Sequence, residues 1–268
     1  MNLVLLLLAL LAPPVREVAI TIDDLPVGQA GPHGCDWDAA SSLTERILKP
    51  IREQHVPVTA FVIANNCANL TVDQRRALLR KWQEAGAEIG NHTWSHPDLN
   101  TMPIAEYEQN ILRGDAFLRD TLGIDHVRWF RSPMLHTGND AATRARLEHF
   151  LAEHQWRQAI VTMSASDWMF ASVLSNTADR AIKARVRETY LPFQESIIVA
   201  AKSRSAPQIL LMHANELNAE TMPEILAMFK RHGYRFVSLD AAMKNQPPNT
   251  FKDPEVPAWL EKEYNRPK

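Results

Sequence analysis

The stretch Ala19-Ile20-Thr21-Ile22-Asp23-Asp24-Leu25-Pro26 places two adjacent carboxylates at the end of a short apolar run. The run from Val18 to Ile22 is rich in β-branched residues, which favours a buried strand. Two bare carboxylates side by side in a pocket repel each other, so one of them needs a cation nearby. Taken alone, the pair could also be a turn or helix-cap motif before Leu25-Pro26.

A second motif, His92-Thr93-Trp94-Ser95-His96, supplies two imidazoles. Pro97 disfavours helical geometry at His96, so we expect a turn that presents both rings. Histidine pairs of this spacing are common on protein surfaces, but here a carboxylate pair ends another strand. Nitrogen and oxygen ligands with an open position suit a catalytic divalent metal, and the spare carboxylate can act as general base. The combination predicts a metallohydrolase.

Apolar runs alternate with amphipathic stretches along the whole chain. We expect strands at Val18–Ile22, Val58–Ala64, Glu88–Gly90, Val127–Phe130, Gln158–Met163, Ile209–Met212 and Arg235–Leu239. We expect helices at Ala39–His55, Thr71–Ala85, Ile104–Leu122, Asp140–Glu153, Thr177–Lys202 and Met222–His232. Asp140 suits a helix cap, Pro223 a first turn and Gly233 a helix stop.

This alternation predicts an α/β fold with a parallel sheet and helices outside it, either a barrel or a doubly wound sheet. About seven strands, and no Gly-x-Gly-x-x-Gly after the first, favour a barrel-like closure. The 268 residues can form a single domain, and 46% hydrophobic with 22% charged residues is typical of a globular protein. A net charge of -2 gives no basic excess for a nucleic-acid partner.

The N-terminal run Leu3–Ala12 is too short to span a membrane but fits the core of a secretory signal. We therefore expect a signal peptide over residues 1–16, an exported protein in the periplasm or outside the cell, and no stable membrane span after processing. A buried first strand is the alternative. We expect the catalytic domain over residues 17–245 and a proline-rich tail over 246–268, either wrapped on the surface or loose. Cys35 and Cys67 could pair in an oxidising compartment or be unrelated thiols.

The candidate polar residues all follow predicted strands. Since the carboxyl ends of parallel strands share one face, we expect residues that are scattered in the sequence to converge there. These residues lie in five ordered motifs: Thr21-Ile22-Asp23-Asp24, His92 to His96, Arg131-Ser132-Pro133, Asp167-Trp168 and Leu211-Met212-His213.

The five motifs resemble those of the polysaccharide deacetylase family. This NodB-like group, carbohydrate esterase family four, includes chitin, chitooligosaccharide and peptidoglycan deacetylases and some acetylxylan esterases. The resemblance runs from Val18 to Leu239, and the first two motifs are the most specific. It implies a distorted (β/α) barrel of about seven parallel strands and one bound divalent metal, zinc or alternatively cobalt or another divalent ion. It also implies an acetylated glycan as substrate, such as peptidoglycan or a chitooligosaccharide.

The resemblance also assigns roles. Asp24, His92 and His96 resemble the metal ligands, and Asp23 the catalytic base. Arg131 resembles the residue that holds the base, His213 the catalytic acid and Asp167 the carboxylate partner of that acid. The resemblance also implies that the backbone N–H of Met134 binds the oxyanion, that Trp168 forms a wall of the acid's pocket and that Leu211 lines the acetyl pocket.

The resemblance implies removal of acetyl groups from N-acetylated amino sugars. O-acetyl ester hydrolysis, hydrolysis of a small amide and a non-catalytic carbohydrate-binding relative are the alternatives. The third motif departs from the family, because Met134 and Leu135 stand where an aromatic residue and a glycine are usual. In the fourth motif Ser164 stands where the family has Asp. Both departures bear on substrate range. Among the tryptophans, we expect Trp94 to face the sugar.

Overall fold

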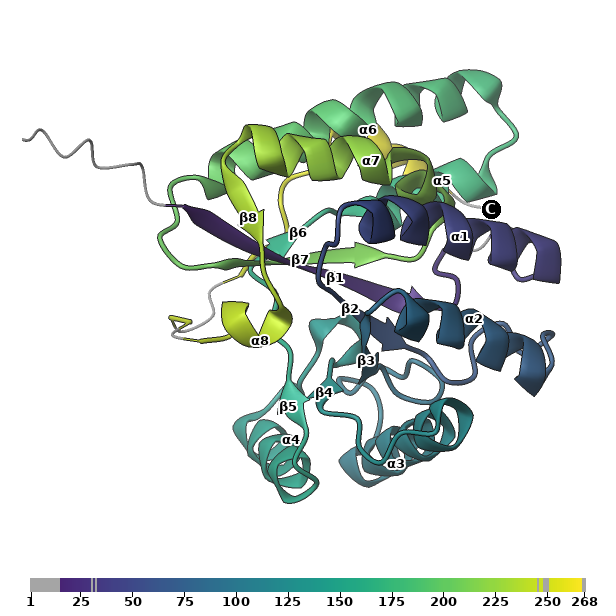
Figure 1. Ribbon diagram of the computed structural model, residues 1–268, viewed down its shortest axis with the longest axis vertical. Helices are drawn as coiled ribbons and strands as arrows, with labels where there is room; N and C mark the ends of the chain where they lie inside the picture. Colours follow the sequence, from purple (N-terminus) through teal and green to yellow (C-terminus); the bar gives the residue numbers. More distant parts are fainter. Residues whose placement is uncertain (1–14, 30, 32, 245, 248–250, 267–268) are drawn as a thin grey trace, which may run out of the picture.

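The computed structural model describes residues 15–29, 31, 33–244, 246–247 and 251–266. Its centre is a sheet of eight strands in which every pairing is parallel. Seven strands follow one path in the order β5-β4-β3-β2-β1-β7-β6, and the short β8 pairs with the start of β1. The sheet curls, with helices outside it (Figure 1). The prediction of a distorted barrel of about seven parallel strands is confirmed.

The central strand is β1 (Arg16–Leu25), which carries the two adjacent carboxylates near its end. It pairs with β7 (Gln208–His213) so that Asp23 lies opposite His213. Its pairing with β2 (Val58–Val62) slips between Ile22 and Leu25, which marks a bulge. A bulge rotates the chain locally and re-aims side chains. Asp23 and Asp24 therefore lie within the irregular end of the strand rather than after it.

The next three strands on one side of β1 and β2 are short: β3 (Glu88–Asn91), β4 (Trp129–Phe130) and β5 (Arg157–Gln158). On the other side, β6 (Met163–Ser164) pairs with β7. The expected single strand Gln158–Met163 is therefore wrong. Its ends belong to opposite edges of the sheet, and residues 159–162 cross between them because backbone bonds from Ala159 and Thr162 reach Phe130 and Ile209 respectively.

Most helices lie where the apolar periodicity predicts them. The described helices are α1 (Trp37–Glu53), α2 (Val72–Glu84), α3 (Ile104–Leu122), a 3-10 turn (Pro133–Leu135), α4 (Ala141–Glu153), α5 (Asp167–Asn176), α6 (Arg180–Ala201), α7 (Glu216–Arg231), α8 (Leu239–Ala242) and α9 (Ala258–Tyr264). Asp140 caps α4 by accepting from the backbone N–H of Thr143. Gly233 follows α7 with a left-handed φ of 77° and ends that helix, as expected.

One helix prediction and one strand prediction are wrong at their boundaries, and some helices were not predicted. Helix α7 begins at Glu216, well before the expected Met222, because the Asn215 side chain caps it at Asn218 N–H. Pro223 consequently lies inside the helix rather than in its first turn. The predicted strand Arg235–Leu239 is also displaced: β8 is Tyr234–Phe236, and Leu239 opens α8. Helices α5, α8 and α9, of 10, 4 and 7 residues, were not predicted.

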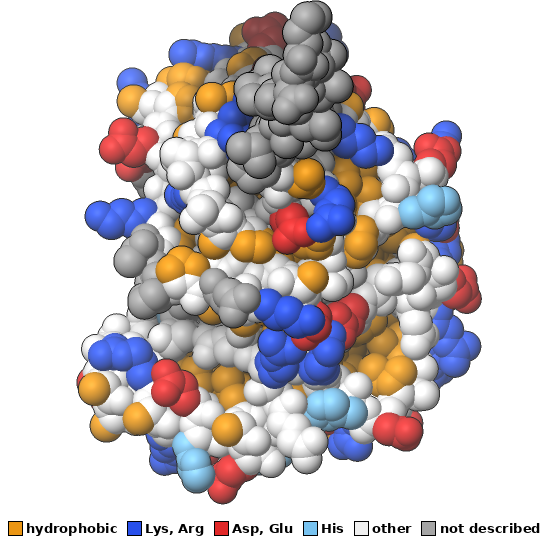
Figure 2. Space-filling view, turned by 60° about the vertical axis from the view of Figure 1, so that its left-hand side comes forward, with side chains coloured by type: hydrophobic (Ala, Val, Ile, Leu, Met, Phe, Trp, Pro, Cys, Tyr) orange, Lys and Arg blue, Asp and Glu red, His pale blue; other side chains and the backbone are white. Residues whose placement is uncertain are grey.

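The described residues 251–266 of the C-terminal tail are anchored to the domain rather than loose. Leu260 of α9 is fully buried, and α9 packs against α5. The expected signal peptide, 1–16, lies almost wholly outside the described residues. No helix in the described ranges is both long and apolar enough to cross a membrane. On the face seen in Figure 2, basic and acidic side chains are interspersed and form no single-sign area.

A disulfide joins Cys35 to Cys67. The bond links the loop that precedes α1 to the loop after β2. Of the two alternatives that the sequence left open, paired cysteines or unrelated thiols, the structure contains the pair. Asn66, the residue before Cys67, links the same loop to the end of β1 and the residues that follow it. Asn66 donates through Nδ2 to the carbonyls of Asp24, at 3.0 Å, and of Val27, at 2.6 Å.

Reducing this disulfide should lower the free energy of unfolding by roughly 3–4 kcal/mol, because the closed loop spans a sequence separation of 32 residues. Urea unfolding followed by tryptophan fluorescence, with and without reductant, measures the difference. A Cys35→Ala/Cys67→Ala double variant is the control and should not respond to reductant. An unchanged urea midpoint after verified reduction of the wild-type protein would contradict the prediction.

Candidate active site

A pocket of 410 Å³ opens at the carboxyl ends of the strands. Most of the residues singled out in the sequence line it: Asp23, Asp24, His92, His96, Met134, Trp168, Leu211 and His213. Arg131 and Asp167 lie directly behind the lining, where they contact Asp23 and His213. The expected convergence of the five motifs is therefore what the fold produces.

The His92–His96 turn is held by the end of β3 and by α3. Asn91 accepts from Thr93 N–H at 2.8 Å and donates to the Ile111 carbonyl at 3.0 Å. The helix comes close because Gly114 has no side chain: a Cβ there would lie 2.9 Å from the carbonyl carbon of Thr93. The turn is not helical, as Pro97 predicts.

Asp24, His92 and His96 form a cluster whose ligand atoms all lie within 4.8 Å of one another. Asp24 Oδ1 is 3.5 Å from Nε2 of His92 and 3.5 Å from Nε2 of His96. That oxygen is buried and makes no hydrogen bond within the described residues. A buried carboxylate oxygen without a partner is costly unless a cation satisfies it. Two imidazoles and a carboxylate are a donor set suited to zinc and similar divalent ions, so these residues fit such an ion.

The surroundings of His92 keep its imidazole neutral, which is the form that can bind a metal ion. Burial, with a smaller contribution from the neighbouring His96, lowers the pKa of His92 to about 3, although Asp24 opposes the shift. Nδ1 of His92 lies 2.8 Å from the Arg131 carbonyl, which fixes Nδ1 as the donor and leaves the Nε2 lone pair facing Asp24.

Asp23 is held by a buried arginine. Nη1 of Arg131 donates to Asp23 Oδ1 at 2.7 Å and to Thr21 Oγ1 at 2.7 Å. Burial raises the pKa of Asp23, while the charges of Arg131 and His213 act in the opposite direction. A carboxylate with one oxygen fixed and a raised pKa has the properties of a general base.

His213 and Asp167 form a buried pair on the opposite wall. His213 Nδ1 is 3.1 Å from Asp167 Oδ1, and His213 N–H donates to Oδ2 at 2.9 Å. Burial by itself would lower the pKa of His213, but the charge and hydrogen bond of Asp167 outweigh it and raise the pKa to about 9. The ring is therefore protonated at neutral pH, as a general acid requires.

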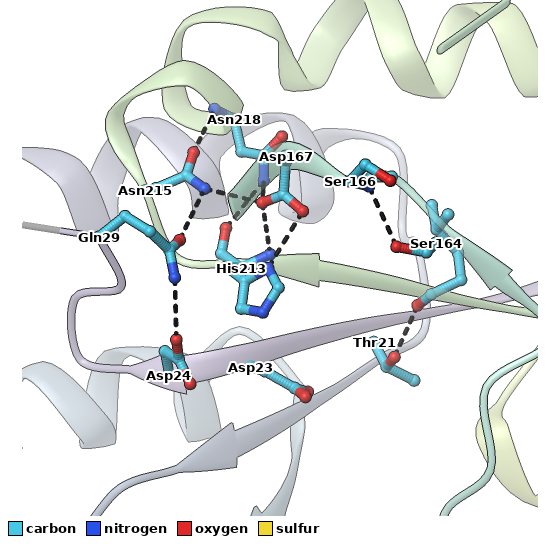
Figure 3. Close-up of polar contacts among 12 residues, drawn as sticks. Thr21, Asp23, Asp24, Gln29, Ser164, Ser166, Asp167, His213, Asn215 and Asn218 are labelled. Atoms are coloured by element: carbon cyan, nitrogen blue, oxygen red, sulfur yellow. Dashed lines mark hydrogen bonds and ion pairs between the residues drawn. The ribbon is translucent and has the colours of Figure 1, made fainter. Parts of the chain in front are cut away.

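Two asparagines complete the surroundings of Asp167 (Figure 3). Asn215 Nδ2 donates to Asp167 Oδ2 at 2.7 Å, and Asn218 Nδ2 donates to the same oxygen at 2.6 Å. Buried Tyr190 in turn donates to Asn218 Oδ1 at 2.6 Å. These donors fix the orientation of the Asp167 carboxylate.

Gln29 connects the two halves of the site. Its Nε2 donates to Asp24 Oδ2 at 3.1 Å, and its Oε1 accepts from Asn215 Nδ2 at 3.3 Å (Figure 3). The bond to Asp24 engages Oδ2 and leaves Oδ1 directed at the two imidazoles. Hydrogen-bonded side chains thus connect the Asp24–His92–His96 cluster to the His213–Asp167 pair.

Left-handed backbone is concentrated around the pocket. Non-glycine residues with positive φ include Asp24, Gln29, Thr93, His96, Met134, Leu135 and Ser166. Such conformations cost free energy and persist where the surrounding structure enforces them, which occurs preferentially at functional sites. The departure at Met134 and Leu135 is informative here, since φ values of 55° and 59° show that the loop has left-handed geometry without a glycine.

The structure also corrects and extends the residue set. Trp94 does not line the pocket; it packs edge-on against Phe117, with the Arg113 guanidinium over its ring at 3.7 Å. Ser164, the other departure, accepts from Ser166 N–H at 3.1 Å and so supports the turn before Asp167. Residues that the sequence did not reveal are Gln29, Asn215, Asn218, Asp253 and Tyr264. Only Asn215 carried a signal, as a helix-cap residue.

A family model described as polysaccharide deacetylase matches residues 11–150 of the chain. The chain belongs to the polysaccharide deacetylase family. It is 23% identical over 226 residues to the peptidoglycan-N-acetylglucosamine deacetylase PgdA of Listeria monocytogenes, covering 84% of this chain and 38% of that protein. The chain thus spans about a third of the length of the curated relatives that it matches first.

Solved structures of polysaccharide deacetylases share its fold. The chitin deacetylase of Colletotrichum lindemuthianum superimposes with a TM-score of 0.63 at 21% identity, covering 88% of this chain and 90% of that one. A pseudoenzyme of carbohydrate esterase family four from Bacillus anthracis gives a TM-score of 0.60 at 18% identity, covering 86% and 66%. The fold is therefore shared by members with and without activity, and function must be argued from the site residues.

Metal retention should separate the roles of the two adjacent carboxylates. Asp24→Asn and His92→Asn should lose bound zinc on dialysis, because each removes a ligand from the cluster. Asp23→Asn should retain zinc, since one oxygen of Asp23 is committed to Arg131. Gln29→Met should weaken zinc binding by roughly tenfold, through the freed Asp24 carboxylate. Elemental analysis and calorimetric titration measure these effects; equal zinc loss in Asp23→Asn and Asp24→Asn would show that the two carboxylates share the role.

The His213 imidazole should titrate near pH 9 in the metal-free protein and at a much lower pH in Asp167→Asn, where burial is no longer opposed by a carboxylate. NMR of histidine-labelled protein measures both titrations, and a His213→Gln variant assigns the resonance. A wild-type midpoint at the ordinary histidine value would refute the pairing.

Proposed function

We propose that this protein is a metal-dependent hydrolase that removes acetyl groups from N-acetylated amino sugars in a polysaccharide or oligosaccharide. The observation that carries the proposal is the meeting of three groups in one pocket: the Asp24–His92–His96 cluster, the Arg131-held Asp23, and the Asp167-supported His213. Cleavage of an acetamide needs a base for water, stabilisation of the oxyanion and an acid for the leaving amine.

Asp24, His92 and His96 would hold the metal ion. Bound there, a divalent ion would supply Lewis-acid chemistry, by polarising the acetyl carbonyl and lowering the pKa of water in the pocket. Zinc suits the donor set best, with cobalt or another divalent ion as alternatives.

Asp23 takes the proton from the attacking water. Its Oδ1 is fixed by Arg131, so Oδ2 is the oxygen that accepts the proton. Burial, which raises its pKa, makes it a stronger base near neutrality than an exposed aspartate would be.

His213 donates a proton to the departing amine from the opposite wall. An amine is a poor leaving group unless it is protonated as the carbon–nitrogen bond breaks, and the charge of Asp167 keeps the imidazole protonated until then. Leu211 and Trp168 line the pocket between these groups, where the acetyl methyl and the sugar would pack, and the backbone N–H of Met134 is our candidate oxyanion donor.

The decisive experiment incubates zinc-loaded protein with a panel of glycans and measures lost acetyl groups by mass spectrometry. The panel contains chitin oligomers, peptidoglycan fragments and O-acetylated xylan. We expect deacetylation of N-acetylated members, its loss on chelation and its return on adding zinc. Release of acetate only from acetylated xylan would make the protein an esterase. Undiminished activity after verified metal removal would overturn the metal-dependent mechanism, and binding without turnover would identify a non-catalytic relative.

His213→Ala should lower kcat/KM on an N-acetylglucosamine oligomer by roughly 100-fold or more, as expected for loss of a general acid. The same variant should lose less than about tenfold on 4-nitrophenyl acetate, whose leaving group needs little protonation. Asp167→Asn should follow the same pattern to a smaller degree. Equal losses on both substrates would mean that His213 does not serve the leaving group.

We also propose that the protein is exported to the periplasm or the cell exterior. The apolar run Leu3–Ala12 supports export, and so does the Cys35–Cys67 disulfide, because disulfides persist in oxidising compartments. Cell fractionation of the native host tests this, with mass spectrometry of the N-terminus to detect processing. Full-length, reduced protein found solely in the cytosol would refute it.

A further inference from the structure

The pocket has a wall that none of the five motifs contributes. Asp253 and Tyr264, from the C-terminal residues 251–266, line it together with the motif residues. This C-terminal segment lies outside the region matched by the family model. The substrate-facing surface of this protein therefore includes side chains that the family motifs do not specify.

The segment is held firmly enough to shape a binding site. Leu260 is fully buried, and the Trp259 ring lies 4.3 Å beneath the guanidinium of Arg185 on α6. At the end of α9, Tyr264 meets the ring of Trp168 edge-on, with ring centroids 5.2 Å apart. Trp168 follows Asp167 directly, so the C-terminal segment contacts the catalytic wall itself.

Beyond Tyr264 lies a second hollow of 300 Å³. It is formed by the end of α5, including Asn176 and Thr177, and by Glu263, Tyr264 and Arg266 of the C-terminal segment. Tyr264 lines both hollows and therefore stands between them. Arg266 pairs with Glu263 at 2.8 Å, so these two charges offset each other.

The chemistry of this wall suits a sugar ring. The exposed fraction of Tyr264 is 38%, which leaves aromatic surface for the C–H face of a pyranose. Asp253 is exposed and makes no hydrogen bond or ion pair within the described residues, so its carboxylate can accept from sugar hydroxyls. The same carboxylate repels an anionic substituent on that sugar.

We propose that Tyr264 and Asp253 form a second sugar-binding subsite, which takes the unit joined to the acetylated sugar and favours uncharged N-acetylated oligomers over glycans with carboxylate substituents. The inference rests on the proposed function and names its substrate class. Chitin-type oligomers, in which every unit is uncharged, fit this subsite. Peptide-free peptidoglycan strands, in which alternate units carry a free lactyl carboxylate, fit it poorly.

The test compares Tyr264→Ala and Asp253→Asn with wild type on three substrates: 4-nitrophenyl acetate, an N-acetylglucosamine tetramer, and a peptidoglycan tetrasaccharide. The small ester carries no second sugar, so the activity that each variant keeps on the ester is the baseline against which its activity on the two oligomers is compared. Tyr264→Ala should lower kcat/KM on the tetramer about tenfold, mainly through KM, as expected for one lost aromatic contact. Tyr264→Phe retains the ring and should stay near wild type.

Asp253→Asn should reduce the preference for the uncharged tetramer over the peptidoglycan fragment, since it removes the repulsive charge. An unchanged tetramer KM in Tyr264→Ala, an equal loss on the small ester, or an unchanged preference in Asp253→Asn would overturn the subsite.

Calorimetric binding of the tetramer separates this proposal from the proposed function. If wild type binds the tetramer without deacetylating it, and Tyr264→Ala weakens that binding, the subsite stands while the proposed function fails. If the tetramer is deacetylated but Tyr264→Ala binds it as wild type does, the subsite fails alone. Failure of wild type to bind any oligomer overturns both.

Discussion

A fully buried arginine, Arg131, joins the parts of the structure on which the site depends. Its guanidinium reaches Thr21 and Asp23 on the central strand and lies 4.3 Å over the ring of Phe61 on the next one. The same group donates to the carbonyls of Ala159 and Ile160, in the segment that crosses between the two edges of the sheet. Its own carbonyl orients His92. The Arg131 side chain thus closes the seam of an incomplete barrel and positions Asp23, while its backbone carbonyl orients His92. A buried charge is tolerated here because Asp23 pairs with it and its donors are engaged.

Burial shifts the pKa values of His92 and Asp23, whereas at His213 a neighbouring carboxylate outweighs it. Burial lowers the pKa of His92 to about 3 although Asp24 opposes the shift, so the imidazole is neutral and can bind a cation. His213 is also buried, yet Asp167 raises its pKa to about 9, so it keeps its proton. At neutral pH the His92 ring is therefore neutral, while the His213 ring on the opposite wall is protonated. His92 and His213 differ through their neighbours, not through their residue type.

Hydrogen bonds maintain the geometry of this site, and that geometry requires strained backbone conformations. Asp24 and His96 both have left-handed φ, as do Met134 and Leu135 on the facing loop. Such conformations are kept where hydrogen bonds over-determine the chain, as Asn66 does beneath Asp24. The C-terminal segment adds a further wall through Tyr264, so that the motif residues make the reactive centre while a later part of the chain shapes the approach to it.

The sequence by itself determined the parallel α/β fold, the five motifs and their meeting at one edge, because the parallel direction of the strands follows from alternating apolar and amphipathic runs. Helix α3 was predicted at its observed bounds for the same reason. Local pattern does not report long-range pairing, so the sequence could not show that Gln158–Met163 divides between two edges of the sheet. Nor could it reveal Gln29 and Tyr264. Their roles arise from contacts with Asn215 and Trp168, residues distant in sequence, and only the packed chain brings them together.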